Sequence, residues 1–302
     1  MITSTQTLLP SWSPPTWVNA LLCLAILVYA RGWIRLHAAS PKLISAWRLA
    51  GFLAGIAGIW LAIGSRLAAF DDSSLTVHMV QHLLLMSLSP PLILLGWPAL
   101  PLLHGLPEWA IRLIVGPVFR SRLFKSLAGA ATHPLVCWLA AAFALVGWHT
   151  PGVFEAALRL DWLHELEHAS FLAAGLLFWW PVIQPWPSTN RWPRWSIPLY
   201  LFAATLPCDV LSGFLAFCDR VVYASYLSGP SAFGFSALQD QECAASLMWV
   251  SVTLVLLIPA VVVTMEILSP TKAQWGEAAV TGRPRVAGQN LPLPSTVSVL
   301  EK

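Results

Sequence analysis

The chain has 302 residues, of which 57% are hydrophobic and only 10% are charged. Charged residues make up about a quarter of an ordinary soluble domain, so this composition excludes a soluble globular protein. The formal net charge of +3 is too small to indicate a nucleic-acid-binding protein. The composition therefore favours an integral membrane protein.

Seven apolar segments, bounded by charged residues or prolines, follow one another along the chain. Several approach the ~20 residues that a helix needs to cross a bilayer. The segments cover residues 17–33, 49–65, 75–95, 133–149, 163–184, 196–217 and 240–267. The sequence thus predicts an all-α integral membrane protein, with a seven-transmembrane-helix bundle over residues 17–268. We expect an outer N-terminal segment at 1–16 and, because residues 269–302 are polar with Pro and Gly, a disordered cytoplasmic tail.

Residues 108–127, between the third and fourth segments, are basic on one side and apolar on the other. This pattern is typical of a helix that lies in the membrane interface. Pro117 interrupts the stretch near its middle. We therefore expect an interfacial pair of helices in the third loop, on the cytoplasmic face, rather than an eighth span.

The Lys and Arg residues are distributed unevenly over the connections. The first, third and fifth loops and the tail hold fourteen of them, and the second, fourth and sixth loops hold three. Cytoplasmic loops carry the excess of Lys and Arg in membrane proteins. The alternation predicts that the N-terminus lies outside and the C-terminus inside.

Two histidine pairs have i,i+4 spacing. His78 and His82 occur in "HMVQH", and His164 and His168 occur in "HELEH". On a helix, residues four apart lie on one face at ~6 Å, and two imidazoles at that spacing can reach one metal ion. Each pair is therefore a candidate metal-binding element.

The predicted topology brings the two pairs to the same end of the bundle. The third span begins near His78, the fourth ends near His149 and the fifth begins near His164. Clustered polar groups at membrane depth indicate function. We therefore predict a metal site in the outer layer, made by His78, His82, His149, His164 and His168. His37, His104 and His133 lie on the cytoplasmic side and are interpreted as interfacial histidines.

Three further residues are candidate additional or transfer ligands. Asp240 begins the seventh span in the outer layer, Met86 lies one turn beyond His82, and Met248 lies two turns into the seventh span. Thioether sulfur beside imidazole favours Cu(I) over other metals. The five cysteines show no C-x-x-C pair and are interpreted as packing residues, with Cys218 and Cys243 near helix ends on one side.

The sequence "HELEH" also spells H-E-x-x-H, the zinc-protease motif. In that alternative Glu165 would be the general base, and Asp209 in the sixth span would be the third zinc ligand. The alternative leaves His78, His82 and His149 without a role. A di-iron centre would need more carboxylates than the layer offers.

Four ordered blocks over residues 75–265 carry a family resemblance. They read "HMVQHLLLMSLSPPLILLGWP", "WHTPGVFEAAL", "LHELEHASFLAAGLLFWWPVI" and "DQECAASLMWV". These blocks resemble the multi-span CtaG family of caa3-type cytochrome c oxidase assembly factors. The predicted histidines, Asp240 and Met248 occupy motif positions of that family.

The resemblance implies a multi-pass protein of the bacterial inner membrane that is not an enzyme. It would supply copper to the catalytic subunit of a haem-copper oxidase. Our own hypothesis for the mechanism is that the copper arrives from the periplasm, with a periplasmic copper donor as a further partner, and is held as Cu(I). Membrane lipid would be its other partner. A zinc metalloprotease, a copper or small-solute transporter and a metal-independent assembly scaffold stay open as alternatives.

Overall fold

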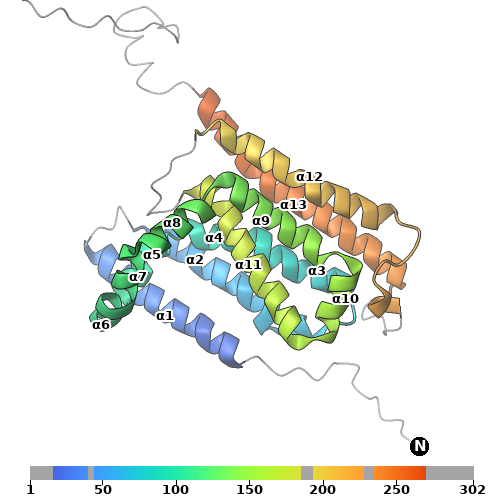
Figure 1. Ribbon diagram of the computed structural model, residues 1–302, viewed down its shortest axis with the longest axis horizontal. Coiled ribbons are helices and arrows are strands. Elements are labelled where there is room, and N and C mark those ends of the chain that lie inside the picture. The colour runs from blue at the N-terminus through green and yellow to red at the C-terminus, as the bar shows by residue number, and fades with distance from the viewer. Residues whose placement is uncertain (1–15, 40–43, 185–192, 228–233, 270–302) are drawn as a thin grey trace, which may run out of the picture.

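The computed structural model describes residues 16–39, 44–184, 193–227 and 234–269, which form helices and include no strand (Figure 1). The α-helices are α1 (Thr16–Ala39), α2 (Ala46–Ile59), α3 (Leu75–His82), α4 (Ser89–Leu95), α5 (Ala99–Gly105), α6 (Glu108–Ala110), α7 (Gly116–Arg120), α8 (Arg122–Ala131), α9 (Pro134–Trp148), α10 (Pro151–Arg159), α11 (Asp161–Ile183), α12 (Ser196–Phe217) and α13 (Ala237–Leu268). Short 3₁₀ or π-helical segments are η1 (Trp60–Gly64), η2 (Arg66–Ala69), η3 (Leu83–Leu88), η4 (Ile111–Val115) and η5 (Ala224–Leu227). Apart from Thr16 and Ser269, the predicted outer segment and tail lie outside the described residues.

Six helical segments of the described chain are long and apolar enough to cross a membrane. They are Thr16–Ala39, Ala46–Ala69, Leu75–Leu95, Asp161–Ile183, Ser196–Phe217 and Ala237–Leu268. The fourth predicted span coincides with α9, which has only 15 residues. Helix α9 completes a seventh candidate only together with α8, from which it is bent by 70°. The all-helical class is therefore confirmed, whereas the count of seven spans depends on how this bent pair is treated.

The distribution of side chains is the reverse of that in a soluble protein. Phe143 is 80% exposed and Phe217 is 79% exposed, while His78, Gln81 and Glu167 are fully buried. Large exposed apolar surfaces are stable in lipid, where polar groups are instead directed to the bundle interior. This arrangement supports the membrane assignment and draws attention to the buried polar groups.

Small residues allow the helices to approach closely. A Cβ atom on Gly55 of α2 would lie 2.5 Å from Ile93 Cγ1 of α4, and one on Gly175 of α11 would lie 2.5 Å from the carbonyl oxygen of Met86 in η3. Such contacts leave no room for a side chain. Gly175 therefore holds α11 directly against the segment that follows α3.

The break in the third loop falls at a different residue from the one expected. Pro117 lies in the first turn of α7, where its missing N–H is tolerated. The chain instead leaves helical geometry at Ser121, whose hydroxyl accepts a hydrogen bond from the backbone N–H of Phe124 and caps α8. The expectation of a break at Pro117 was therefore wrong, because Ser121 supplies the cap that starts a new helix.

The two ends of the bundle differ in their elements. Helix α10 and the first turns of α3, α11 and α13 lie at one end, and α5 to α8 lie at the opposite end (Figure 1). We call the first of these the α10 end. The predicted metal-site histidines belong to elements that meet at this end.

Candidate metal centre

The two histidine pairs face each other across the interface of α3 and α11. Within each pair the ring centroids are 4.3 Å apart. Between the pairs, His78 and His164 stack at 5.5 Å, and His82 and His168 lie 5.9 Å apart. Helix α3 begins at an N-cap, Ser74, whose hydroxyl accepts from the N–H of Val77. Four of the five predicted histidines thus form one cluster, as their spacing indicated.

Glu167 completes this cluster, although the sequence did not single it out. Its side chain is fully buried, and its Oε1 lies 3.4 Å from His82 Nε2 and 3.8 Å from His78 Nε2. The ligand atoms of these three residues all lie within 4.8 Å of one another. We call His78, His82 and Glu167 the inner triad. Two imidazoles and one carboxylate are a common ligand set for a transition metal.

A second group of ligand atoms overlaps the first. Asp71, His78 and His164 also have ligand atoms within 4.8 Å of one another, and we call them the outer triad. Asp71 Oδ2 lies 3.8 Å from His164 Nε2, and the backbone oxygen of Asp71 accepts from the hydroxyl of Tyr226. Burial, with a smaller contribution from Asp72, raises the pKa of Asp71 to about 7. The two triads share His78.

The cluster contains many buried polar atoms that lack a hydrogen-bond partner among the described residues. These atoms are both ring nitrogens of His78 and His82, Nε2 of His164 and His168, and both carboxylate oxygens of Glu167. Roughly nine in ten buried polar groups in proteins are hydrogen-bonded. A bound cation would satisfy several of these atoms at once, so the donor set fits a metal ion.

His149 lies beside the cluster and, like His168, belongs to neither triad. Its ring centroid is 5.8 Å from that of His82. Its Nδ1 lies 2.7 Å from the carbonyl oxygen of Leu145, and its Nε2 lies 3.3 Å from Met79 Sδ. The hydroxyl of Tyr223 donates to its backbone oxygen. His149 is therefore held in place, with Nε2 directed at a sulfur atom.

Asp240 has a different environment from the triads. Its carboxylate accepts hydrogen bonds from the hydroxyls of Ser74 and Thr76 and from the backbone N–H groups of Leu75 and Thr76. These donors belong to the first turn of α3, so Asp240 joins α13 to the start of α3. Because its oxygens already have donors, this placement favours a structural role over metal binding.

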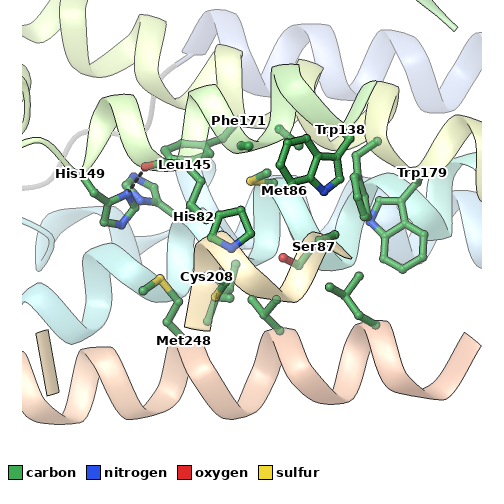
Figure 2. Close-up of a pocket in the computed structure, with 18 of the residues that line it drawn as sticks. His82, Met86, Ser87, Trp138, Leu145, His149, Phe171, Trp179, Cys208 and Met248 are labelled. Carbon is green, nitrogen blue, oxygen red and sulfur yellow. Dashed lines mark hydrogen bonds between the residues drawn. The ribbon is translucent and has the colours of Figure 1, made fainter. Parts of the chain in front are cut away.

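The two candidate methionines line a cavity next to the cluster. Met86 and Met248 share it with His82 and His149, and Cys208 of α12 also contributes a sulfur atom (Figure 2). Met248 and Cys208 are buried. Cys243 is exposed and Cys218 is partly exposed, and neither lines this cavity.

The residues of the zinc-protease alternative are not brought together. Glu165 is exposed, whereas Glu167, two residues later, is the acid that is directed into the cluster. Asp209 is half-buried on α12 and belongs to neither triad. A general base must reach the metal-bound water, and an exposed Glu165 does not meet this requirement.

The remaining histidines have backbone partners outside the α10 end. His37 Nδ1 lies 2.6 Å from the oxygen of Ile44, and His104 Nδ1 lies 2.9 Å from the oxygen of Leu100. His133 Nδ1 accepts from the N–H of Leu135. These contacts agree with their interpretation as histidines without a part in the metal site.

Proteins of three mycobacteria are similar in sequence to this chain. An uncharacterized protein of Mycobacterium bovis and one of Mycobacterium tuberculosis are each 27% identical over 248 residues, which is 76% of this chain and 36% of the relative. An uncharacterized protein of Mycobacterium leprae is 23% identical over 272 residues, 87% of this chain and 39% of the relative. The chain thus spans little more than a third of these relatives. No solved structure matches it.

The family described as cytochrome c oxidase caa3 assembly factor, Caa3_CtaG, matches residues 27–269. This range includes the triads, His149 and the cavity beside them. It also extends beyond the four blocks of residues 75–265 on which the resemblance was based. The chain therefore belongs to the family of cytochrome c oxidase caa3 assembly factors.

Proposed function

We propose that the protein is an assembly factor of the bacterial inner membrane that binds copper, as Cu(I), and delivers it to the catalytic subunit of a haem-copper oxidase. Copper is the cargo of this reaction, and no covalent step is part of it. Family membership supports the link to oxidase assembly. The cluster at the α10 end supports the link to a metal.

One observation carries the copper proposal. Glu167 and His78 are fully buried, and their side-chain nitrogen and oxygen atoms have no hydrogen-bond partner among the described residues. A buried carboxylate without a hydrogen-bond partner is costly, so it persists where a cation offsets the cost. Imidazole is a good ligand for copper, and the adjacent sulfur atoms favour its reduced form.

The location of the cluster supports delivery on the periplasmic side. Arg112, Arg120, Arg122 and Lys125 lie in the α6–α8 region, at the end opposite the cluster. Under the positive-inside rule that basic end is cytoplasmic, and the α10 end is then periplasmic. An N-out, C-in chain with α8 and α9 as its fourth span has this orientation. A periplasmic donor would then have direct access to the cluster.

The two triads differ in exposure, and this difference suggests a route for copper. The His164 side chain is 21% exposed, whereas His78 and Glu167 are fully buried. In the proposal copper enters at the outer triad and passes to the inner triad, with His78 as a ligand in both. A shared ligand keeps the metal coordinated while the other ligands exchange.

The test uses cells from which the wild-type protein has been deleted and in which a variant is expressed instead. Glu167→Gln and the double variant His164→Ala, His168→Ala should fail to restore oxidase activity and copper in the catalytic subunit. The matched control is Glu165→Gln, an exposed acid on the same helix, which should restore both. Immunoblots of membranes establish that each variant is inserted.

Two outcomes would contradict the proposal. Full oxidase activity with the double histidine variant would favour a metal-independent assembly scaffold. Loss of activity with Glu165→Gln alone would return the "HELEH" segment to the zinc-protease alternative.

A second candidate, a zinc enzyme, is favoured by one observation. Two histidines and a glutamate, as in the inner triad, are the ligands of several catalytic zinc sites. The residue that follows the first histidine of this pair is Met79 rather than an acid. Asp71 would then have to act as the general base. Zinc in place of copper in the purified protein would support this candidate.

A further inference from the structure

A cavity of about 70 Å³ lies next to the histidine cluster and is lined by residues of α3, η3, α9, α11, α12 and α13. A single water molecule needs about 10–15 Å³ of such space, so the cavity has room for more than a metal ion. Four of its lining residues carry sulfur: Met79, Met86, Cys208 and Met248. Figure 2 shows three of these side chains around the same space as the rings of His82 and His149. We call this space the sulfur chamber.

The methionines of the protein are concentrated in this chamber. The chain has five methionines, of which Met1 lies outside the described residues. Three of the other four line the chamber, and the fourth, Met265 on α13, is 63% exposed. Methionine commonly fills gaps in apolar cores. Gap filling alone does not explain why three methionines border the same unfilled space.

The contact between His149 and Met79 points to a ligand. His149 Nδ1 lies 2.7 Å from the carbonyl oxygen of Leu145, so Nδ1 carries the hydrogen and donates it. In the neutral ring Nε2 then has only a lone pair. That lone pair faces Met79 Sδ at 3.3 Å, and a thioether sulfur is also only an acceptor. A soft cation beside both atoms would accept the two lone pairs.

The charge of the chamber selects the kind of cation. Thioethers, a thiol and neutral imidazoles supply no negative charge, and the other lining residues include Trp138, Phe178 and Trp179. The cost of placing an ion in such apolar surroundings rises with the square of its charge, so a monovalent ion is far less costly than a divalent one. Soft sulfur ligands also select Cu(I).

We propose that the sulfur chamber is a second metal site, specific for a soft monovalent cation such as Cu(I), with His149 and Met79 as ligands and Cys208 and Met248 as further sulfur donors. The identification of the cation as copper rests on the proposed function, while the chamber's preference for soft monovalent ions does not. Neither the inner nor the outer triad contains these four residues.

His82 connects the chamber with the cluster. It belongs to the inner triad and also lines the chamber, and both of its ring nitrogens lack a hydrogen-bond partner among the described residues. In the proposed sequence Cu(I) moves from the inner triad to the chamber through His82, as it moves between the triads through His78. The ion keeps its charge, and its ligands change from oxygen and nitrogen to nitrogen and sulfur.

The test compares two probe ions on the full chain purified in detergent. Ag⁺ is a soft monovalent ion that should occupy both the cluster and the chamber, whereas Zn²⁺ should occupy the cluster alone. The wild type should therefore bind about one Ag⁺ more per chain than Zn²⁺. The double variant Met79→Leu, Met248→Leu should lose this additional Ag⁺ and keep its Zn²⁺. The control is Met265→Leu, an exposed methionine on the same helix as Met248, which should change neither value.

Leucine and methionine have similar volumes, so the double variant should fold. X-ray absorption provides a second readout, first on the wild type. The spectrum of the bound Ag⁺ or Cu(I) should show sulfur atoms among the nearest neighbours of the metal. Cys208→Ser should reduce this sulfur signal, and Cys243→Ser, an exposed cysteine on α13, should not.

The outcomes distinguish a failure of the chamber proposal from a failure of the proposed function. If the Met79, Met248 variant binds as much Ag⁺ as the Met265 variant, the chamber is not a metal site, and the cluster proposal is unaffected. If His164→Ala, His168→Ala loses Zn²⁺ and keeps about one Ag⁺, the chamber is an independent site. If the wild type binds Ag⁺ through sulfur but neither copper nor zinc at the cluster, the chamber stands and the proposed copper cluster fails.

Discussion

Asp240 and Glu167 are both buried acids at the α10 end, and they differ in their hydrogen bonding. The Asp240 carboxylate accepts hydrogen bonds from four donors in the first turn of α3. The Glu167 carboxylate has no hydrogen-bond partner among the described residues and lies beside two imidazoles. Burial alone therefore does not identify a functional acid. The set of partners separates an acid that holds two helices together from one that is available to a ligand.

The largest expected change in stability follows from removing the Asp240 carboxylate. Asp240→Ala leaves the donors of Leu75 and Thr76 without an acceptor. Each hydrogen bond to a charged group contributes about 1.5–3 kcal/mol, so the loss of two should lower the free energy of unfolding by about 3–6 kcal/mol. Thermal unfolding in detergent measures this loss. Glu242→Ala, an exposed acid two residues further on, is the control, and equal stability of the two variants would remove the distinction drawn above.

A smaller loss of stability is expected from a substitution that separates α11 from η3 and leaves Asp240 unchanged. In Gly175→Ala, the new Cβ would lie 2.5 Å from the oxygen of Met86. Overpacking of this kind costs about 1–3 kcal/mol. It should also weaken metal binding, because Glu167 and His168 move with α11. Gly147→Ala on α9, where nothing lies within 4 Å of the added Cβ, should change neither property and serves as the control.

Replacing Glu167 should change the stability of the metal-free protein in the opposite direction. Glu167→Gln replaces a buried acid that has no hydrogen-bond partner among the described residues, so it should raise the unfolding free energy of the metal-free protein by about 1–3 kcal/mol. The same variant should lose the stabilisation that metal gives the wild type. Unfolding curves with and without chelator measure both quantities. A metal-free variant that is less stable than the wild type would show that Glu167 is already satisfied by protein groups.

The smallest effect is expected at the neighbouring exposed acid. Glu165→Gln changes a side chain at the surface, where substitutions usually alter stability by less than about 0.5 kcal/mol. Unfolding temperature and metal content should therefore equal those of the wild type. A marked change in either would mean that both acids of "HELEH" act at the cluster.

The helix spans and the histidine pairs could be predicted from the sequence because they depend on local periodicity. The third and sixth predicted spans, 75–95 and 196–217, match the structure at both ends. The i,i+4 spacing placed both imidazoles of each pair on one face. That face then had to meet the other pair, since polar groups in a membrane bundle are directed inward.

Glu167 was missed because the H-E-x-x-H pattern drew attention to Glu165. Helical geometry did not decide between the two acids, since Glu167 is three residues after His164 and Glu165 is three residues before His168, so each neighbours one histidine of the pair. In the structure Glu165 is exposed, whereas Glu167 lies on the side of α11 that faces His78 and His82 of α3. The packing of α11 against the segment of His78 and His82 selects Glu167, and periodicity within α11 alone does not.

Other features could not be predicted because they depend on packing between distant segments. Asp71 and Asp72 are adjacent in a loop, and only the fold determines that Asp71 faces His164. The hydrogen bond from the backbone N–H of Leu75 to Asp240 joins residues 165 apart in the sequence. The sulfur chamber likewise needs α12 and α13 to pack beside α3, so Met79 and Cys208 carried no signal of their own.

The most direct test of the account is the copper and zinc content of the purified full chain, compared for wild type, Glu167→Gln and Glu165→Gln after growth with both metals. The account predicts copper in the wild type, the same amount in Glu165→Gln, and a loss of about one copper per chain in Glu167→Gln. Equal copper in the two glutamate variants, or zinc in place of copper in the wild type, would contradict it.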